Sequence, residues 1–249
     1  QHIMRRNLLL LFVITFALTM RAQVKGNQPQ NKNYQQAIVD SMSKAVLSCN
    51  ISPLDNVEKE LKAKKPYRVY NYWLSFCLLH KALYFTTMKQ DQQAQACLNE
   101  GEHIFETQAG KNAEEYALLA YIQGVSIKFV KGMDAAVIAR KSVNNAQQAT
   151  QIDPKNTRAW YVLGMLDDYT PKQFGGQQKC EALLEKALAQ PTSKTNNPYE
   201  PTWGRKEAYN LLLEYLVTTG NKEKAKTIYQ KAKTEFPNAP ELKKYENQL

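Results

Sequence analysis

The sequence predicts an all-α protein built from stacked helical hairpins, and three observations carry this prediction. Apolar residues from Tyr34 onward recur at intervals of three and four, the spacing of one face of an α-helix. Strand signals are nearly absent, because the sequence has no Asn-Gly hairpin turn and no sustained alternation of apolar and polar residues. A pattern of small residues, aromatics and prolines returns at intervals of roughly 40 to 50 residues, which is typical of a repeat array.

Ahead of the first helix, the chain begins with a segment of the secretory kind. The basic pair Arg5-Arg6 precedes the uncharged apolar stretch 8–20, and Ala22 follows before a polar chain. This order predicts a signal peptide over residues 1–22, with residues 1–3 as an upstream remnant. The apolar stretch would reach about 20 Å as a helix, against about 30 Å for a membrane core, so a retained anchor is the weaker alternative. We therefore expect export to the periplasm or outer cell surface, with no stable membrane span after cleavage.

The chain carries a net positive charge. The formal net charge is +10, and removal of Arg5, Arg6 and Arg21, with no acid in that segment, leaves +7. A charge of this size raises the question of nucleic-acid binding, since phosphate contacts dominate such binding. The positive residues are not clustered, and an exported protein seldom meets nucleic acid. We expect no nucleic-acid partner, while an acidic partner or a membrane surface stays open.

The helical domain is expected to span residues 34–249, after a polar, unpatterned leader over 23–33. One helix begins near Tyr34 and stops near Asn50. A second begins at Ser52-Pro53, with Ser52 as the cap and the proline in the first turn. It ends before Pro66.

Four hairpins are expected after these two helices. In each, a small or apolar residue of the first helix precedes a small residue of the second by a similar interval. The interval is twelve residues in three of the pairs and sixteen in the fourth. The pairs are Ala82 and Ala94, Gly124 and Ala136, Gly164 and Cys180, and Leu213 and Ala225. A glycine within a helix costs roughly 1 kcal/mol relative to alanine, so Gly124 and Gly164 indicate close packing of two helices.

The motifs within these pairs resemble the tetratricopeptide repeat. Trp160-x2-Leu163-Gly164 matches the opening of its first helix, and Ala225-x3-Tyr229-x2-Ala232 followed by Pro237 matches its second helix and end. The resemblance implies a right-handed superhelical array of antiparallel hairpins over about 67–106, 113–152, 157–190 and 205–236, with a capping helix over 240–249. The insert TPKQFGG, the EKAL run and the P-x-WG sequence also resemble a group of secreted bacterial tetratricopeptide-like proteins.

Two segments depart from the regular repeat. The insert Thr170 to Gly176 contains a proline and paired glycines, which prevent simple helix extension and project a loop carrying Phe174. The stretch Asn196 to Gly204 holds two prolines and two aromatics before the last hairpin, and Trp203 is expected to pack on the preceding repeat. Each segment is either a packing device between repeats or the lip of a binding site.

The residues that usually carry chemistry do not form a recognisable motif. There is no H-E-x-x-H, no G-x-S-x-G and no phosphate loop. His103 and Glu106 could share a helix face, but such a pair is more often solvated than metal-bound. Cys77 and Cys97 would lie on facing helices of one hairpin, where a disulfide is an alternative to two free thiols. We expect a non-catalytic protein with no cofactor.

The resemblance implies that the first helix of each hairpin lines a concave groove. Offsets from the small packing positions place eight candidate partner-binding residues in that groove, and the Phe174 loop is a further candidate. The eight are His80, Tyr121, Lys128, Arg158, Tyr161, Asp168, Asn210 and Glu214. The alternative for Tyr121 and Tyr161 is packing between repeats, because tyrosine packs well there with its hydroxyl satisfied.

The expected function is that of an exported scaffold or adaptor that binds a protein or peptide through this groove. A carrier of a small or lipidic ligand inside the superhelix is the alternative, and it would need a closed apolar cavity. A hydrolase is a third possibility, which would need titratable groups converging in one pocket.

Overall fold

The computed structural model describes residues 32–64, 67–192, 195–246 and 248–249. The expected signal peptide, and the expected leader as far as residue 31, lie outside the described residues. No helix in the described part is long and apolar enough to cross a membrane.

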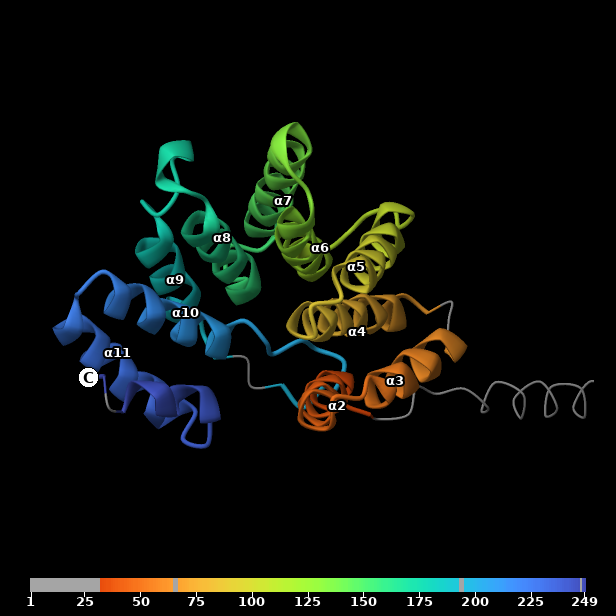
Figure 1. Cartoon of the computed structure of the whole chain (residues 1–249), viewed down its shortest axis with the longest axis horizontal. Coiled ribbons are helices and arrows are strands. Elements are labelled where there is room, and N and C mark those ends of the chain that lie inside the picture. The colour runs from red at the N-terminus through yellow and green to blue at the C-terminus, as the bar shows by residue number, and fades with distance from the viewer. Residues whose placement is uncertain (1–31, 65–66, 193–194, 247) are drawn as a thin grey trace, which may run out of the picture. The chain divides into compact units, whose positions relative to one another are not determined.

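The described residues are helical throughout their regular structure and contain no strand (Figure 1). The helices follow one another as α2 (Tyr34–Ser48), α3 (Ser52–Ala63), α4 (Arg68–Thr87), α5 (Asp91–Glu106), α6 (Ala113–Ser126), α7 (Gly132–Ile152), α8 (Thr157–Tyr169), α9 (Cys180–Ala189), α10 (Arg205–Thr218) and α11 (Lys222–Glu235). Three 3-10 turns join or follow them: η1 (Ile127–Phe129), η2 (Lys172–Phe174) and η3 (Pro240–Tyr245).

Asparagine side chains begin several of these helices. Asn33, Asn112, Asn156 and Asn221 each accept a hydrogen bond from a backbone N–H three residues on, which satisfies a donor that the helix leaves unpaired. Asn112 also forms a reciprocal capping box with Glu115. Helix α3 differs slightly from expectation, because Ser52 is already its first residue and Ile51 takes the cap position.

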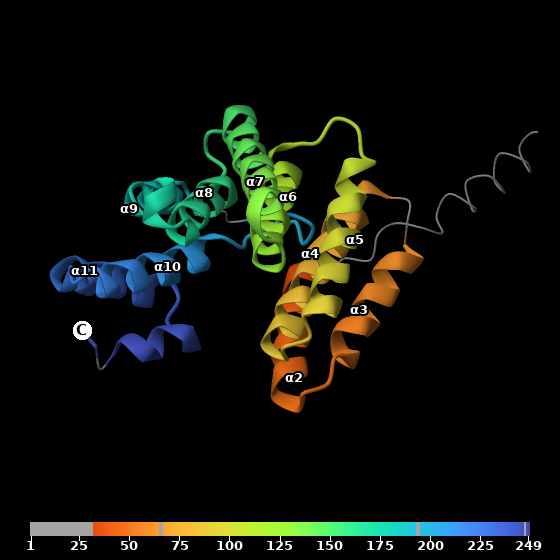
Figure 2. The same cartoon turned by 45° about the horizontal axis from the view of Figure 1, so that its top comes forward.

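Consecutive helices pack in pairs, α2 with α3, α4 with α5, α6 with α7, α8 with α9, and α10 with α11. The first helices of neighbouring pairs also contact one another, from α2 through α4, α6 and α8 to α10. Figure 2 shows the pairs following one another along the array. The segment after Pro240, expected as a capping α-helix, is instead the 3-10 turn η3, which covers α10 and α11 with Leu242 and Tyr245.

Gly164 is the point of closest approach between two helices. A Cβ atom at Gly164 would lie 2.7 Å from Leu184 Cδ2 and 2.8 Å from its Cγ, so α8 and α9 could not pack this closely with any larger residue. Gly124 similarly faces Ser142 of α7 and the side chains of Met165 and Leu166.

The expected partner of Gly124 was wrong. Ala136 is exposed, and the fully buried residues of α7 are Ser142, Ala146 and Ala149. The hydroxyl of Ser142 donates to the carbonyl of Ala120 at 2.7 Å and fixes this register. The twelve-residue interval holds where the two helices are joined by three residues, whereas five residues join α6 to α7.

Candidate binding face

The segment 197–204, which we call the crossing segment, leaves its own hairpin and lies across the first helices of the earlier repeats. Its Trp203 is almost fully buried and stacks among rings from three helices. The ring centroid of Trp203 lies 5.9 Å from that of Phe76 on α4, 5.6 Å from Tyr121 on α6 and 6.4 Å from Tyr161 on α8. The sequence placed Trp203 on the preceding repeat, and the contacts extend two repeats further back.

Polar side chains of the same helices hold the backbone of the crossing segment. The side-chain oxygen of Gln35 on α2 accepts from the backbone N–H of Thr202 at 2.7 Å and of Trp203 at 3.2 Å. Arg158 on α8 donates to the carbonyl of Trp203 at 3.3 Å. The indole N–H of Trp203 donates to the hydroxyl of Tyr72 on α4 at 2.8 Å. An irregular segment of turns is therefore held by both its main chain and its aromatic anchor.

Arg158 is the centre of this arrangement. Its guanidinium donates twice to the carboxylate of Glu114, once at 2.5 Å, in a fork that holds the side chain rigidly. Gly204 adopts φ +97°, and a Cβ there would meet Arg158 Cγ at 2.9 Å. The glycine is therefore required where the crossing segment turns into α10. Arg158, predicted as a groove residue open to a partner, is instead buried against the chain's own segment.

Tyr121 and Tyr161 pack between repeats, the alternative that the sequence left open. Their hydroxyls lie 3.5 Å apart, and their rings meet edge to face at 5.7 Å. Burial, moderated by the hydrogen bond to Tyr161, raises the pKa of Tyr121 to about 12, and burial raises that of Tyr161 further. Tyr161 is buried and Tyr121 half-buried, so neither offers a free surface to a partner beside Trp203.

His80 is also withdrawn from the surface. Its Nδ1 lies 2.9 Å from the carbonyl of Phe76, and its ring lies 4.3 Å from the ring of Phe76. Burial, opposed in part by this hydrogen bond, lowers the pKa of His80 to about 4. The imidazole is therefore neutral at physiological pH.

The other four predicted groove residues differ in their surroundings. Asn210 is engaged by η3, because the hydroxyl of Tyr245 donates to its backbone carbonyl at 3.1 Å. Lys128 lies on η1, exposed and away from the crossing segment, with its ammonium 5.8 Å from the ring centroid of Phe129. Asp168 and Glu214 remain accessible to solvent.

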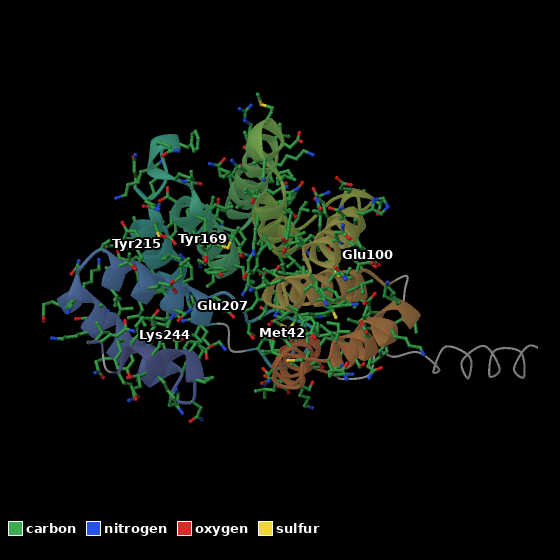
Figure 3. All side chains as sticks on the ribbon, viewed as in Figure 1. Met42, Glu100, Tyr169, Glu207, Tyr215 and Lys244 are labelled. Carbon is green, nitrogen blue, oxygen red and sulfur yellow. The ribbon has the colours of Figure 1, made fainter. Side chains whose placement is uncertain are left out.

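Asp168 and Glu214 belong to an open stretch between α8, α10 and η3, where the crossing segment does not reach. Tyr169 is 73% exposed here, and Lys244 of η3 lies 3.3 Å from the Glu214 carboxylate. Partial burial and the charges of Glu214 and Asp168 raise the pKa of Tyr169. Partial burial, Glu214 and Asp167 likewise raise the pKa of Asp168. Figure 3 labels Tyr169, Tyr215 and Lys244 in this stretch, which we call the open patch.

The offsets in the sequence predicted Asp168 and Glu214 as groove residues but did not identify Tyr169. The last of the offsets from Gly164 gave Asp168, whereas the exposed Tyr169 is the next residue and the last of the helix. An exposed aromatic at the end of a first helix, directly before a proline insert, is the feature that could have identified it.

The Phe174 loop is a shaped turn. Gly175 adopts φ +84°, and a Cβ at Gly176 would lie 1.9 Å from the carbonyl oxygen of Thr170, so both glycines are required. The backbone N–H of Gln177 donates to the carbonyl of Asp167 at 2.7 Å and closes the loop. Phe174 is 75% exposed at its tip.

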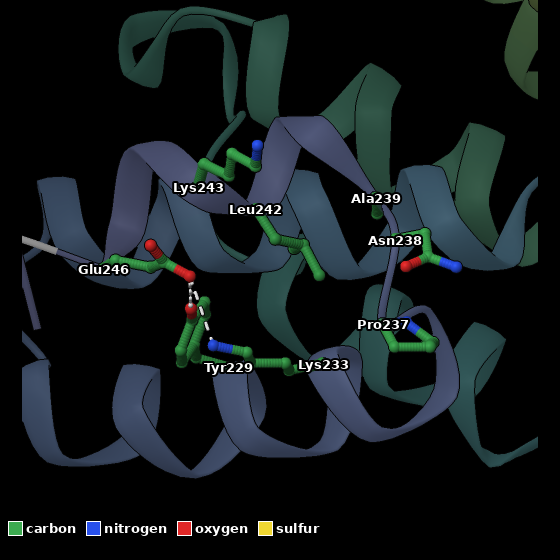
Figure 4. Close-up of a pocket in the computed structure, with 8 residues that line it drawn as sticks. All are labelled: Tyr229, Lys233, Pro237, Asn238, Ala239, Leu242, Lys243 and Glu246. Atoms are coloured by element: carbon green, nitrogen blue, oxygen red, sulfur yellow. Dashed lines mark hydrogen bonds and ion pairs between the residues drawn. The ribbon is translucent and has the colours of Figure 1, made fainter.

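Two cavities lie at the carboxyl end of the described chain. The first has a volume of about 200 Å³ and lies between α11 and η3 (Figure 4). Glu246 crosses it, accepting from the hydroxyl of Tyr229 at 3.2 Å and from Lys233 at 3.1 Å. The second is an open depression beside Thr192 and α11. Pockets for drug-sized ligands typically have about 300–1,000 Å³, so the first cavity is small for a carried ligand.

The four cysteines are free thiols, and the alternative of a Cys77–Cys97 disulfide is not realised in the structure. Burial raises the pKa of Cys77 to about 12 and that of Cys97 to about 11, which disfavours the nucleophilic thiolate. The pair His103 and Glu106 is exposed, with 3.8 Å between the nearest nitrogen and oxygen. Within the described residues, no group of three or more potential metal ligands is gathered.

Comparison with solved structures identifies the fold of this chain. No family model and no curated protein matches the sequence. A solved structure of a thermophilic TPR protein from Thermus thermophilus is similar, with a TM-score of 0.56 and 16% identity over 85% of this chain and 98% of that one. The fold is tetratricopeptide-like.

A second solved structure with a similar fold is that of a haemophore. The HusA haemophore from Porphyromonas gingivalis is similar with a TM-score of 0.53 and 18% identity, over 77% of this chain and 97% of that one. Both identities are low, so these similarities establish the tetratricopeptide-like array of helical pairs and not a shared ligand.

Proposed function

We propose that this chain is a non-catalytic scaffold that binds an extended segment of a partner protein on the face formed by its first helices. The crossing segment is the observation that carries this proposal. The face already holds one irregular, non-helical segment of polypeptide, with Gln35 and Arg158 on its backbone and aromatic rings around Trp203. Helical repeat arrays commonly use their concave surfaces for such recognition.

The open patch is the proposed contact site, because the crossing segment already occupies the aromatic and polar groups around Trp203. The segment is tethered at both ends, so its effective concentration is high and a free peptide would displace it poorly. The exposed ring of Tyr169 offers apolar contact, and the carboxylates of Asp168 and Glu214 offer acceptors for an amide or a cation. We infer a partner segment with an apolar or aromatic anchor next to a lysine or arginine.

A carrier of a small ligand is the second candidate function. The likeness to a haemophore supports it, as does the cluster of aromatic rings on α4, α6 and α8. Trp203 fills that cluster, however, and the cavity between α11 and η3 is small and has Lys233, Lys243 and Glu246 in its lining. The protein-binding proposal therefore has more support.

Export to the periplasm or outer surface is part of the proposal. It is supported by the basic pair, apolar stretch and small residue that precede the helical array in sequence. Amino-terminal sequencing of the protein from fractionated cells tests it, and a first residue of Gln23 is expected.

Selection from a library of random extended peptides, displayed against the full chain, tests the binding proposal. We expect one enriched peptide family that the triple variant D168N/Y169A/E214Q binds at least about tenfold more weakly, a loss of about 1.4 kcal/mol. The matched control Q147A/Q148A changes exposed residues of α7 and should bind as the parent does. Equal binding by all three proteins would exclude the open patch. Native mass spectrometry of the purified chain serves the alternative, since a carrier would retain a small molecule.

A further inference from the structure

The first half of α7 projects beyond the helix on which it packs. Ser142 lies opposite Ala120 and Gly124, while α6 has only two residues after Gly124. The nine residues 133–141 that precede Ser142 span about 14 Å of helix. Figure 1 shows the end of α7 that follows η1 at the top of the view, beyond the ends of α5 and α8. We call residues 128–141 the α7 tip.

The α7 tip exposes apolar side chains where a helix of a repeat array would bury them. Met133 is 78% exposed and Val137 is 47% exposed, one helical turn apart on the same face. Ala136 beside them is exposed as well. Among the exposed large apolar residues of the described chain, Met133 and Val137 are the one pair spaced a turn apart on one helix.

Cations flank these apolar residues on both sides. Lys128 and Lys131 precede them and Arg140 and Lys141 follow, all exposed, with Asp134 as the one acid of the tip. Four cations less one acid give a local charge of +3. In the part of the chain that the structure describes, none of the four has a carboxylate partner, whereas Lys62, Lys81 and Lys224 each have two.

We propose that the α7 tip docks onto an anionic lipid membrane surface. A convex tip with a short apolar stripe between cations suits a lipid interface, since the apolar side chains enter it while the cations contact the headgroups. A protein partner would have to supply an acidic hollow of matching shape, whereas a bilayer adapts to the tip. This surface lies on α7 and η1 and is separate in sequence from the residues of the open patch, so the proposal goes beyond the binding of a partner segment.

Cosedimentation of the full chain with vesicles tests the docking. Two compositions are compared, phosphatidylcholine alone and phosphatidylcholine with about 30% phosphatidylglycerol. Binding to the anionic vesicles alone, weakened by added salt, is expected. Each neutralised cation should lower partitioning about fivefold, so K131Q/R140Q/K141Q should bind more than about a hundredfold more weakly. M133S/V137S should also weaken binding while leaving the salt dependence in place.

Matched controls separate the tip from general effects of charge and hydrophobicity. K44Q/K222Q/K231Q removes the same number of exposed charges elsewhere, and L47S removes an apolar side chain that is 87% exposed on α2. Both should bind as the parent does. Any binding by residues 1–31 is common to every variant, so the differences between variants report the tip.

Three outcomes would overturn the proposal. They are equal binding by the tip variants and the controls, equal binding to both kinds of vesicle, and no vesicle binding by the parent. Capture of polyglutamate by the parent and not by K131Q/R140Q/K141Q, without vesicle binding, would reassign the tip to an acidic protein. Circular dichroism of each variant excludes unfolding as the cause of a loss.

Discussion

At the residue scale, single side chains decide which part of the binding face is closed. Trp203 joins three repeats through its ring, and its backbone N–H bonds to Gln35 of α2. Its neighbours Tyr72 and Arg158 satisfy its indole N–H and carbonyl, so the closed part of the face has few unpaired polar groups. The open patch lies on the part of the face that the crossing segment does not contact.

Substitution of Trp203 should destabilise the whole array. Trp203→Ala is expected to lower the free energy of unfolding by about 3–5 kcal/mol, because the ring leaves a cavity among Phe76, Tyr121 and Tyr161. The control Phe174→Ala, at an exposed ring, should change it by less than about 0.5 kcal/mol. Urea denaturation followed by circular dichroism measures both. A loss of under about 1 kcal/mol for Trp203→Ala would mean that the crossing segment is only loosely attached.

His80 should make stability depend on pH. Its pKa is about 4 in the folded chain and about 6.5 when unfolded, so the unfolded state binds the additional proton between these values. The stabilisation is complete above pH 6.5, falls as the pH drops from 6.5 to 4, and falls no further below that. At pH 5 the loss relative to pH 8 is about 2 kcal/mol.

Denaturation midpoints at pH 5 and pH 8 give this difference. His80→Gln should remove it, while His103→Gln, at an exposed side chain, should retain it. The same pH difference in the parent and in His80→Gln would show that His80 is not the group responsible.

At the element scale, the packing of helix pairs depends on which small residues face one another. Gly164→Ala should destabilise the chain by about 1 kcal/mol or more, because overpacking against Leu184 exceeds the gain of about 1 kcal/mol in helix propensity. Gly124→Ala should be close to neutral, since its added Cβ meets the flexible ends of Met165 and Leu166 at 3.0 Å. Denaturant midpoints of the two variants decide this. A Gly164→Ala chain more stable than the parent would contradict the close approach of α8 and α9.

The sequence was sufficient to predict helices, repeats and several packing positions. Ala82, Ala94, Leu213 and Ala225 are fully buried as the twelve-residue interval predicts, because three residues join each of these helix pairs. The interval failed at Ala136, where the connection is longer and α7 shifts outward. A fixed sequence interval predicts which residues of two helices face one another only when the loops that join the helices have equal lengths.

The candidate site was harder to predict, because it depends on a segment distant in sequence. The offsets assumed an empty groove, and local patterns do not show that residues 197–204 return to α2, α4 and α6. Arg158 and Tyr161 lie where the repeat pattern places them, yet they contact Trp203 and Gly204. Proline, tryptophan and glycine in an irregular stretch indicated a special conformation but not its destination.

At the scale of the whole molecule, the contact of Gln35 with Thr202 and Trp203 joins the first described helix to the segment before the last hairpin. Repeat arrays usually contact only their neighbours, so this long-range link should raise the cooperativity of unfolding. The proposed function requires that a partner reaches the first-helix face at the open patch, beside Tyr169.

Site-specific photo-crosslinking tests this claim most directly. A photoreactive phenylalanine analogue replaces Tyr169 in one protein and Gln148 of α7 in a second, and both are expressed in their native cells and irradiated. We expect one crosslinked protein partner at position 169, absent at position 148 and lost when D168N and E214Q are added. The same crosslinked species at both positions, or none at position 169, would contradict the account.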